Sequence, residues 1–442
     1  MFNGKNIFVL GMGRSGVAVS NLLCEKNHIL LTDVKGDDLS LIKQLEEKGI
    51  NVVITDHQEE VLTSKFDYVV KNPGVRNDHE VVLKAKKLNI PVINEMEVAY
   101  NFLPKGVKIV GITGSNGKTT TSYLTYEILS LASLPVHLGG NMGIPLCDML
   151  ESIKENDVLV LEISSHQLVN FNKFKTDISV LTNFSEVHLD FFGNYDNYKN
   201  NKLRIFNHHT VDDVAILNGS DKAVCEKTKD IVSKKLYFSS SNEADCYIDD
   251  GYIYYKEEKV CEISDIRLKG KHNYENVMCA IMVAKEFGVS NSVIKEALAK
   301  FSGVEHRMEF VRRLNDREFY NDSKATNNKS TIVALSSFES PVILILGGLD
   351  RGQSFDELNG HLDYVKSVVC YGQTKEKIEK YFTDKDIDVT VVDNLEEAVK
   401  LAYNLSEEND TILFSPACAS WDQFDSFEQR GKLFKEIVEN LQ

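Results

Sequence analysis

A glycine-rich segment early in the second hundred residues limits what this chain can fold into more than any other feature. The segment runs Ile109-Val-Gly-Ile-Thr-Gly-Ser-Asn-Gly-Lys-Thr-Thr120. The β-branched run over 107–112 predicts a buried strand, and the apolar spacing over 120–131 predicts a helix. Gly114 and Gly117 permit a tight turn between the two. Strand, turn and helix N-terminus gather backbone N–H groups around one point, so this stretch predicts a polyphosphate site.

The residues of this phosphate loop have predicted roles in nucleotide binding. Lys118 would reach the β- and γ-phosphates, and the Thr119 hydroxyl could join the coordination of Mg²⁺. The spacing departs from the strict G-x-x-x-x-G-K-[ST] pattern, because Ile112 holds the place of the first glycine. A Gly-Lys turn that binds nothing is the alternative, and the flanking strand and helix argue against it. The predicted nucleotide contacts of the loop are Gly114, Ser115, Asn116, Gly117, Lys118, Thr119 and Thr120.

A second glycine motif stands near the start of the chain. A predicted strand over 6–10 leads into Gly11-Met-Gly-Arg-Ser-Gly16, and the next strand, over 28–32, ends at Asp33. This arrangement is typical of a Rossmann-like unit with an acid after its second strand. A dinucleotide site, a nucleotide-diphosphate site and a ligand-free turn all remain open. A further strand runs through Tyr68-Val-Val-Lys-Asn-Pro-Gly74, whose Pro-Gly turn should lie on the ligand side of the sheet.

Three polar positions follow the phosphate loop. The apolar run over 157–163 places Glu162 near a strand end, where many phosphate-loop enzymes hold Mg²⁺, although a structural salt bridge is the alternative. His188 follows a predicted strand over 178–182, and a lone histidine is more often a hydrogen-bonded residue than a metal ligand. The predicted helix over 195–206 carries Lys199, Lys202 and Arg204, which by themselves indicate a solvated basic face.

The last part of the chain alternates strands with helices. Strands are predicted at Glu318, over 342–346, 365–371, 389–392 and 411–414, with helices between them. This alternation predicts a second Rossmann-like parallel sheet. We therefore expect an α/β protein of three domains: a Rossmann-like domain over 1–100, a central phosphate-loop domain over 101–301 and a Rossmann-like domain over 302–442.

The net charge and the cysteine content limit the kinds of binding partner and the cellular compartment that we expect. The chain has 66 acidic and 50 basic residues, a net charge of −16, which argues against a nucleic-acid partner. Small anionic ligands need only a local positive pocket. The eight cysteines are scattered without a C-x-x-C pair, which favours reduced thiols in a cytosol. No apolar run approaches the length of a membrane span, so we expect a soluble cytoplasmic protein without a membrane partner.

Taken in order, these motifs resemble those of the Mur ligase family, the ATP-dependent amide ligases of peptidoglycan precursor synthesis. The resemblance covers essentially the whole chain. Two segments, Asn321–Asn327 and Ser415–Phe424, resemble those of the members that add D-glutamate, and no Asp-Asn-Pro-Arg segment is present. The motifs that carry the family resemblance are Thr113–Thr119, Glu162–Ser165, His188–Asp190, Asn273–Asn276, His306–Arg307 and Asp322–Lys324.

The resemblance implies a reaction. The carboxylate of UDP-N-acetylmuramoyl-L-alanine would attack the γ-phosphate of ATP and become an acyl phosphate. The amine of D-glutamate would then attack that carbonyl, leaving ADP and phosphate. The cofactors would be ATP and two Mg²⁺ ions, and the product would serve cell wall synthesis and hence cell shape and division. A monomer is expected.

The resemblance also implies roles for single residues. Glu162 and His188 would hold metal with Thr119, and Lys202 matches a lysine that the family carbamylates. For ATP, Asn273 would contact the adenine side, Arg307 the phosphates and Asp322 the ribose. The D-glutamate pocket would comprise Lys324, Thr326, Ser420 and the Phe427 backbone. The UDP portion would contact Gly11, Gly13, Gly16, Asp33, Lys35, Asn72 and Gly74, and the muramoyl-alanine end would contact Asn141 and His188.

Val34-Lys35 departs from the family pattern, because a Thr-Arg pair often stands there, and Lys loses the bidentate fork of Arg. Three other functions remain open. A nicotinamide-dependent dehydrogenase would rest on Gly11–Gly16 and Asp33 alone, and would leave the phosphate loop unexplained. A non-catalytic nucleotide-gated binding protein would bind ATP without releasing phosphate. A ligase such as folylpolyglutamate synthase would share the central motifs, but not the first domain or the two D-glutamate segments.

Overall fold

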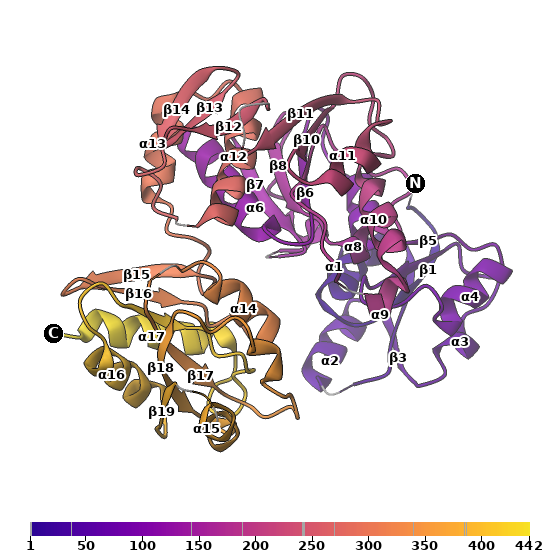
Figure 1. Ribbon diagram of the computed structural model, residues 1–442. Coiled ribbons are helices and arrows are strands. Elements are labelled where there is room, and N and C mark those ends of the chain that lie inside the picture. Colours follow the sequence, from indigo (N-terminus) through magenta and orange to yellow (C-terminus); the bar gives the residue numbers. More distant parts are fainter. Residues whose placement is uncertain are drawn as a thin grey trace. The chain divides into compact units, whose positions relative to one another are not determined.

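A computed structural model describes residues 2–36, 38–142, 144–187, 189–240, 244–268, 270–338, 340–383, 385 and 387–442 (Figure 1). These residues form three β-sheets, each flanked by helices. Two compact units divide the chain: Met1–Ile263 with Glu275–Ala297, and Ser264–Tyr274 with Leu298–Gln442. The first unit holds two of the sheets and the second holds the third. The predicted three-domain α/β architecture is confirmed, and the exact domain boundaries stay a prediction.

The first sheet has the strand order β3-β2-β1-β4-β5, and all its strands are parallel. Ile7 and Val9 pack beneath α1, whereas Phe8 and Leu10 face Val81 on the other side. Apolar residues on both faces explain why the strands read as continuous apolar runs. The elements are β1 (Asn6–Leu10), α1 (Arg14–Leu23), η1 (Cys24–Lys26), β2 (His28–Asp33), α2 (Leu39–Glu47), β3 (Asn51–Ile54), α3 (Gln58–Val61), β4 (Tyr68–Lys71), α4 (Glu80–Lys87) and β5 (Val92–Ile93).

The second sheet has nine strands in the order β14-β13-β12-β11-β10-β9-β6-β8-β7. Its strands run parallel from β7 to β12, and β13 and β14 are added as antiparallel hairpins. The strands are β6 (Lys108–Thr113), β7 (Val136–Gly140), β8 (Val158–Glu162), β9 (Ile178–Leu181), β10 (Val214–Asn218), β11 (Lys234–Ser239), β12 (Cys246–Asp249), β13 (Tyr252–Tyr255) and β14 (Glu258–Glu262).

Because β6 lies between β8 and β9, the segments that follow these three strands meet at one sheet edge. The predicted strands around the phosphate loop and Glu162 are confirmed within a residue or two. The helices of this part are α5 (Glu95–Tyr100), α6 (Lys118–Leu131), α7 (Leu146–Met149), α8 (Ser165–Leu168), α9 (Leu189–Phe192), α10 (Tyr195–Lys202), η2 (Leu203–Phe206), α11 (Lys222–Thr228), α12 (Lys271–Glu286) and α13 (Asn291–Lys300).

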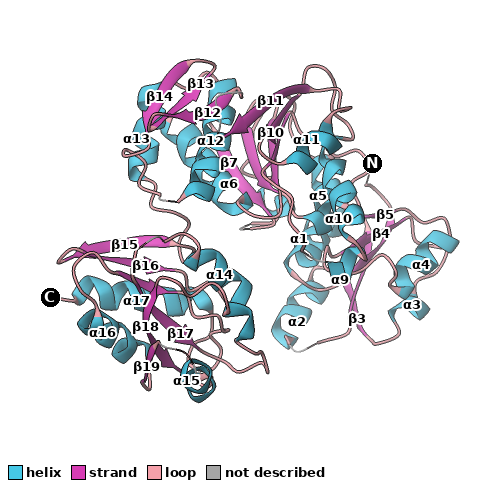
Figure 2. Ribbon diagram, in the orientation of Figure 1, coloured by secondary structure: helices cyan, strands magenta, loops and turns pink. Residues whose placement is uncertain are grey.

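The third sheet has the order β15-β16-β20-β17-β18-β19, and β15 is its only antiparallel member (Figure 2). Tyr320 and Leu344 pack on the side of α14, whereas Phe319 and Ile343 face α16 and α17. The elements are β15 (Glu309–Leu314), β16 (Arg317–Asn321), α14 (Asn328–Leu335), β17 (Val342–Gly347), η3 (Asp356–Leu358), β18 (Val365–Tyr371), α15 (Lys375–Thr383), β19 (Asp388–Val391), α16 (Leu395–Leu405), β20 (Thr411–Phe414) and α17 (Phe427–Asn440).

Two sequence-based expectations about elements are wrong in detail. The sequence predicts a helix over 277–287, preceded by the polar segment 269–276. The helix begins at Lys271 instead, so Asn273 and Asn276 lie in its first turns. The expected all-parallel third sheet has an antiparallel edge strand, β15. Among the helices of the described ranges, none combines the length and the apolar character that crossing a membrane requires.

The short helix α5 fastens the first sheet to the second. The Glu97 carboxylate accepts hydrogen bonds from the backbone N–H groups of Asn172, Lys173 and Phe174, at 3.0, 2.8 and 2.9 Å. The Glu95 carboxylate accepts one from the N–H of Cys147, at 2.5 Å. Both glutamates are buried, and hydrogen bonds to backbone N–H groups are what makes a buried carboxylate tolerable. Helix α7 and the loop that follows α8 are therefore fixed to α5.

We expect Glu95 to make stability depend on pH. Burial raises the pKa of Glu95 from 4.5 to about 7, and the N–H of Cys147 opposes this shift only in part. The folded protein thus holds this proton more tightly than the unfolded chain does. Stabilisation by protonated Glu95 is complete below the unfolded pKa of 4.5 and is lost as pH rises through about 7.

Glu95→Gln cannot ionise, so its stability relative to the wild type should rise as pH increases across this interval. Urea unfolding at several pH values measures the difference. Glu47→Gln, at an exposed position of α2, is the control and should show no such trend. A difference between Glu95→Gln and the wild type that stays constant with pH would show that Glu95 does not titrate there.

Candidate active site

The phosphate loop is shaped by its backbone and by the segment after β9. Gly117 has a φ of +81° at the N-cap of α6, and a Cβ there would overlap the Asn276 side chain. Only glycine meets both conditions without strain. The N–H of Ser115 donates to the carbonyl of Asn183, and the N–H of Asn116 donates to its side chain, both at 3.0 Å. Local sequence and neighbouring strand thus fix the loop together.

Two ammonium groups converge on one carbonyl oxygen of this loop. Lys118 Nζ donates to the Gly114 carbonyl at 2.9 Å and to the Ser115 carbonyl at 2.8 Å. Lys202 Nζ, from the end of α10, donates to the same Gly114 carbonyl at 2.7 Å. The Lys202 side chain is 1% exposed. Burial, with the charge of Lys118, lowers the pKa of Lys202 well below 10.5, and Glu162 opposes this shift.

The burial of Lys202 corrects the interpretation of α10 as a solvated basic face. Tyr198, one turn earlier, shares a hydrogen bond of 2.8 Å with the Ser115 hydroxyl, and its ring lies 5.0 Å from Lys202 Nζ. The Arg204 guanidinium donates to the backbone carbonyls of Leu168 and Phe171, each at 2.8 Å. One face of α10 is therefore part of the phosphate-loop site. The i, i+4 spacing of Tyr198 and Lys202 was the sequence signal for it.

Glu162 stands at the end of β8, beside the phosphate loop. It is paired in register with Ile112 of β6 and is 2% exposed. Its Oε1 accepts a hydrogen bond from the Asn141 amide at 2.9 Å, and the Asn141 N–H donates to its carbonyl at 2.8 Å. Its Oε2 is buried and accepts no hydrogen bond from the described residues, which also offer it no salt-bridge partner within 4.0 Å.

A buried carboxylate oxygen with no donor is costly unless a cation meets it. Mg²⁺ prefers carboxylate and hydroxyl oxygens, so Glu162 fits a magnesium ligand, and buried Thr119 in the first turn of α6 offers a hydroxyl. His188, the other predicted ligand, lies outside the described residues. Thr120, in the same turn of α6, is half-buried.

Two of the predicted UDP residues, Asn72 and Gly74, line a cavity within the first unit, whereas Gly11, Gly13, Gly16, Asp33 and Lys35 do not. This cavity of about 340 Å³ is lined by Asn72 and Gly74 from the first domain and by Asn141 from the second. A Cβ on Gly11 or Gly13 would press on the Asn72 side chain, so these glycines leave room for it. The remaining lining residues are Arg14, Ser15, Pro73, Gly140, Pro145, Ser164, His166 and Gln167.

The Asp33 carboxylate accepts hydrogen bonds from backbone N–H groups near the glycine motif. Its Oδ2 accepts a hydrogen bond from the N–H of Met12 at 2.6 Å, and its Oδ1 accepts one from the N–H of Lys35 at 3.1 Å. The carboxylate thus ties the glycine motif to the end of β2. The Lys35 side chain is exposed. Gly16 lets α1 approach β1, because a Cβ there would overlap the Gly11 carbonyl.

In the second unit, Asp322 follows β16 and is buried. Its Oδ2 accepts a hydrogen bond from the Ser415 hydroxyl at 2.7 Å, and its Oδ1 accepts one from the N–H of Met308 at 3.2 Å. Burial raises the pKa of Asp322 to about 7, opposed by the Ser415 hydrogen bond and by the charge of Arg307. Arg307 stands between two residues with left-handed backbone, His306 at φ +63° and Met308 at φ +47°. Such angles are uncommon outside glycine and fix the direction of the chain at Arg307.

The four predicted D-glutamate residues belong to three neighbouring segments of this unit. Lys324 Nζ lies 5.8 Å from the centre of the Phe427 ring. The N–H of Thr326 donates to the Lys324 carbonyl at 2.9 Å, in a tight turn. Ser420 is 2% exposed and lies in the loop after β20. These positions form one candidate acceptor site.

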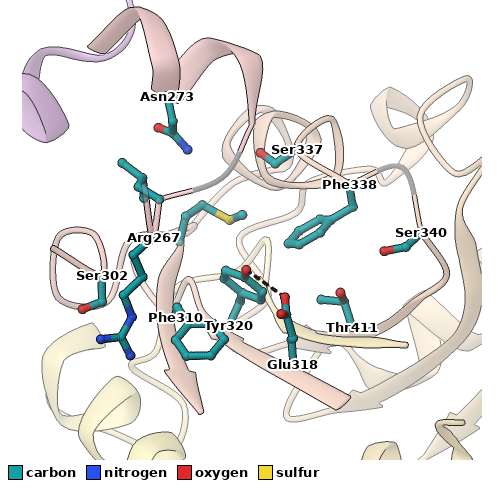
Figure 3. Close-up of a pocket in the computed structure, with 12 residues that line it drawn as sticks. Arg267, Asn273, Ser302, Phe310, Glu318, Tyr320, Ser337, Phe338, Ser340 and Thr411 are labelled. Atoms are coloured by element: carbon teal, nitrogen blue, oxygen red, sulfur yellow. Dashed lines mark hydrogen bonds between the residues drawn. The ribbon is translucent and has the colours of Figure 1, made fainter. Parts of the chain in front are cut away.

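A cavity of about 200 Å³ opens beside Asn273, whose side chain points into it (Figure 3). Phe338, Tyr320 and Met308 give it apolar walls. The Tyr320 hydroxyl donates to Glu318 Oε2 at 3.1 Å, which places a carboxylate at the cavity floor. A flat heteroaromatic ring suits this mixture of apolar walls and few polar groups.

Several residues of these sites were missed from the sequence. Arg14 and Ser15 occupy the x positions of the glycine motif, which a motif leaves undefined. His166 lines the UDP-side cavity and packs edge-on against Phe191, with ring centres 4.4 Å apart. Trp421 is 64% exposed and lies 4.7 Å from the Arg351 guanidinium.

Fold and site together define a three-domain nucleotide-binding enzyme with a phosphate loop in its middle domain. Three family models match the chain: the Mur ligase MurD-like N-terminal domain over 5–94, the Mur ligase middle domain over 112–284, and the Mur ligase glutamate ligase domain over 306–418. The chain belongs to the Mur ligase family, whose members are ATP-dependent amide-bond-forming ligases that use ATP and Mg²⁺.

Similar proteins extend over the whole chain. A UDP-N-acetylmuramoylalanine–D-glutamate ligase of Bacillus cereus (strain G9842) is 42% identical over 445 residues, covering 100% of this chain and 98% of its own. The protein of that name in Geobacillus kaustophilus (strain HTA426) is 42% identical over 446 residues, with the same coverage. The crystal structure of a MurF ligase from Thermotoga maritima in complex with ADP shares the fold, with a TM-score of 0.59, 18% identity and 98% coverage of each chain.

We expect Gly117→Ala to abolish nucleotide binding. The added Cβ must displace Asn276, and the left-handed backbone adds a penalty of about 1–2 kcal/mol. Gly288→Ala is the matched control, because Gly288 has a φ of +74° and nothing within 4 Å of its Cβ position. Calorimetric titration with ADP measures binding, and thermal unfolding measures stability. Equal losses of stability with intact ADP binding in both variants would contradict the role of Gly117.

Proposed function

We propose that this protein adds D-glutamate to UDP-N-acetylmuramoyl-L-alanine, with ATP hydrolysed to ADP and phosphate. The observation that carries the proposal is the arrangement of Lys118 and Lys202 at the phosphate loop, beside the Glu162 oxygen that accepts no hydrogen bond from the described residues. It occurs in a chain that matches named D-glutamate ligases over its full length.

The phosphate loop prepares the first step. Loop N–H groups and Lys118 would hold the triphosphate, so that the substrate carboxylate can attack the γ-phosphorus in line. Two anions must meet in this step, and their repulsion dominates the barrier unless nearby cations offset it. The Lys118 ammonium at the Gly114 carbonyl places positive charge where the anions must meet. The product of this step is an acyl phosphate.

The metal ligands would be Thr119, Glu162, His188 and, if carbamylated, Lys202, and we propose two Mg²⁺ ions. When bound, Mg²⁺ supplies the charge neutralisation that phosphoryl transfer needs. Asn141 donates to Glu162 Oε1, so the buried Oε2 would be the oxygen that holds the metal. A lowered pKa favours the neutral Lys202 amine, the form that reacts with carbon dioxide to give a carbamate. The carbamate would then replace a buried cation with an anionic bridge.

Adenine would occupy the cavity beside Asn273, with the ribose at Asp322 and the phosphates near Arg307. Asn273 offers an amide to the base edge, and the aromatic walls offer stacking (Figure 3). A buried aspartate that already accepts hydrogen bonds from Ser415 and Met308 is rigid, which suits recognition of a ribose.

The second step needs D-glutamate beside the acyl phosphate. A dicarboxylate requires a cation and several donors. Lys324 offers the cation, and Thr326, Ser420 and the Phe427 backbone offer donors. The amine of the bound amino acid attacks the activated carbonyl and phosphate leaves. The UDP portion would lie along Gly11, Gly13, Gly16, Asp33, Lys35, Asn72 and Gly74, with Asn141 and His188 toward the muramoyl-alanine end.

This activity places the protein in peptidoglycan precursor synthesis, and so in cell wall biogenesis, cell shape and cell division. We propose that it acts in the cytoplasm as a monomer, without nucleic-acid or membrane partners. The direct test is phosphate release from ATP with UDP-N-acetylmuramoyl-L-alanine and each of several amino acids. Release with D-glutamate, and not with L-glutamate, supports the proposal. Release with another amino acid, or reduction of a nicotinamide cofactor instead, overturns it.

We expect Lys118→Ala to reduce phosphate release by at least about a thousandfold, because the charge that develops in phosphoryl transfer loses its fixed cation. Lys222→Ala is the matched control, since Lys222 is the exposed first residue of another helix of the same domain, α11. The control should keep wild-type turnover. Near-normal turnover of Lys118→Ala would refute the assignment of the phosphate loop.

We expect Lys324→Ala to raise the KM for D-glutamate at least about tenfold, because a charge-assisted hydrogen bond to a carboxylate is lost. The KM for ATP should change far less. Lys329→Ala, at an exposed position of α14, is the control and should leave both constants unchanged. Equal increases in both constants for Lys324→Ala would count against an acceptor role.

A further inference from the structure

A fully buried guanidinium lies under the candidate acceptor site. Arg430, in the first turn of α17, is 0% exposed, the largest side chain of the described residues to be so completely enclosed. No carboxylate of the described residues lies within 4.0 Å of it. Asp422, in the loop before α17, accepts a hydrogen bond from the N–H of Gln373 at 3.1 Å instead of pairing with it. Arginine is hardly ever buried without a carboxylate, so this position calls for a reason.

The guanidinium ties together the segments that carry the predicted D-glutamate residues. Its Nε donates to the Ser323 hydroxyl at 3.1 Å, and its Nη2 donates to the Ser323 carbonyl at 2.7 Å. The same Nη2 donates to the Cys418 carbonyl at 3.0 Å. Ser323 precedes Lys324, and Cys418 lies two residues before Ser420. One planar fork therefore sets the distance between the Lys324 turn and the Ser420 loop.

The Ser323 hydroxyl links Arg430 to the third segment, at Phe427. Its hydroxyl donates to the Phe427 carbonyl at 2.8 Å while it accepts from Arg430. Phe427 opens α17, the helix that carries Arg430, and its ring faces the Lys324 ammonium. Arg430 thus contacts Ser323 and Cys418 directly and reaches Phe427 through the Ser323 hydroxyl, so one side chain links the three segments.

The charge of Arg430 is not balanced within the described protein. Oxygen acceptors satisfy part of the fork, but Nη1 is buried without a well-formed hydrogen bond among the described residues. Burial raises the pKa of the neighbouring Tyr371 hydroxyl to about 12, and the charge of Arg430 opposes this rise without being neutralised by it. Removing an ion from water costs several kcal/mol, which partial hydrogen bonding does not fully offset. A dicarboxylate bound above it would bring the missing negative charge. The standing positive potential would in turn favour an acceptor with two carboxylates over one with a single carboxylate.

We propose that Arg430 is a positioning residue for the acceptor amino acid. It fixes the spacing of the Lys324, Ser420 and Phe427 segments, and its charge is balanced by the dicarboxylate. This inference rests on the proposed function, because it takes D-glutamate as the acceptor. The contacts of Arg430 described above are all to segments of the candidate acceptor site, so we expect its main effect on the amino acid.

The test compares four variants with the wild type. Arg430→Lys keeps the charge and loses the fork, whereas Arg430→Gln loses both. Ser323→Ala keeps Arg430 and removes the hydroxyl between it and Phe427. Arg312→Lys is the matched control: Arg312 donates to three carbonyls at the other end of α17, at 3.0, 2.8 and 3.3 Å, away from the three segments. Phosphate release gives the KM of each substrate, and thermal unfolding gives stability.

We expect the KM for D-glutamate to rise at least about tenfold in Arg430→Lys and Ser323→Ala, and further in Arg430→Gln. The KM values for ATP and for the UDP-linked substrate should stay within about twofold of wild type. Arg312→Lys should lower the melting temperature and leave all three KM values within about twofold. A change in the KM for D-glutamate alone would show that Arg430 positions the acceptor. A general structural role would instead change all three KM values, or only the melting temperature.

The opposite outcomes are equally clear. A KM for D-glutamate within about twofold of wild type in Ser323→Ala and Arg430→Lys overturns the inference, as does an equal shift in all three constants. If Arg430→Lys does not fold, Ser323→Ala decides alone. A wild-type protein that releases no phosphate on addition of D-glutamate overturns the proposed function itself, and the inference with it.

Discussion

Everything in the central domain depends on two lysine ammonium groups that share one backbone carbonyl. Lys118 and Lys202 both donate to the Gly114 oxygen, at 2.9 and 2.7 Å. Like charges held this close, one of them fully buried, repel each other unless an anion lies between them or one amine is neutral. Burial, together with the charge of Lys118, lowers the pKa of Lys202, which favours the neutral amine. A bound triphosphate would relieve the same repulsion, and so would conversion of one amine to a carbamate. Binding of an anionic ligand is therefore coupled to the charge state of the two lysines.

The order of the strands in the second sheet brings the other predicted site residues beside these lysines. Parallel strands β6, β8 and β9 end at one edge, so the loop, Glu162 and the Asn183 segment meet there. Glu162 in turn is oriented by Asn141, whose loop leads into α7, and α7 is held by Glu95 of α5. A chain of direct contacts thus runs from the first domain to the predicted metal ligand. In the third domain, too, a buried charged side chain holds separate segments together by hydrogen bonds to backbone groups; there it is Arg430 instead of a glutamate.

The sequence predicts elements correctly where a short segment combines a clear apolar periodicity with a recognisable functional motif. The strand–glycine–helix pattern at 107–131 and the strand ending at Glu162 needed no tertiary information. β3 is not predicted, although Val52, Val53 and Ile54 are apolar, because it is a four-residue edge strand that is only half-buried. β15 is not predicted because its charged residues Arg312 and Arg313 interrupt the apolar pattern of a strand. The start of α12 was placed late, since its first turns are polar. The charge pattern of α10 alone does not predict the burial of Lys202, because that burial depends on partners from distant segments; the family resemblance alone assigns Lys202 to the site.

The measurement that tests the central claim most directly follows oxygen atoms through the reaction. UDP-N-acetylmuramoyl-L-alanine labelled with ¹⁸O in its carboxylate is turned over with ATP and D-glutamate, and the released phosphate is analysed by mass. If the carboxylate attacks the γ-phosphate at the Lys118–Lys202 site, one labelled oxygen leaves with each phosphate. Phosphate that contains no label would mean that no acyl phosphate forms, and the account of the site would be wrong.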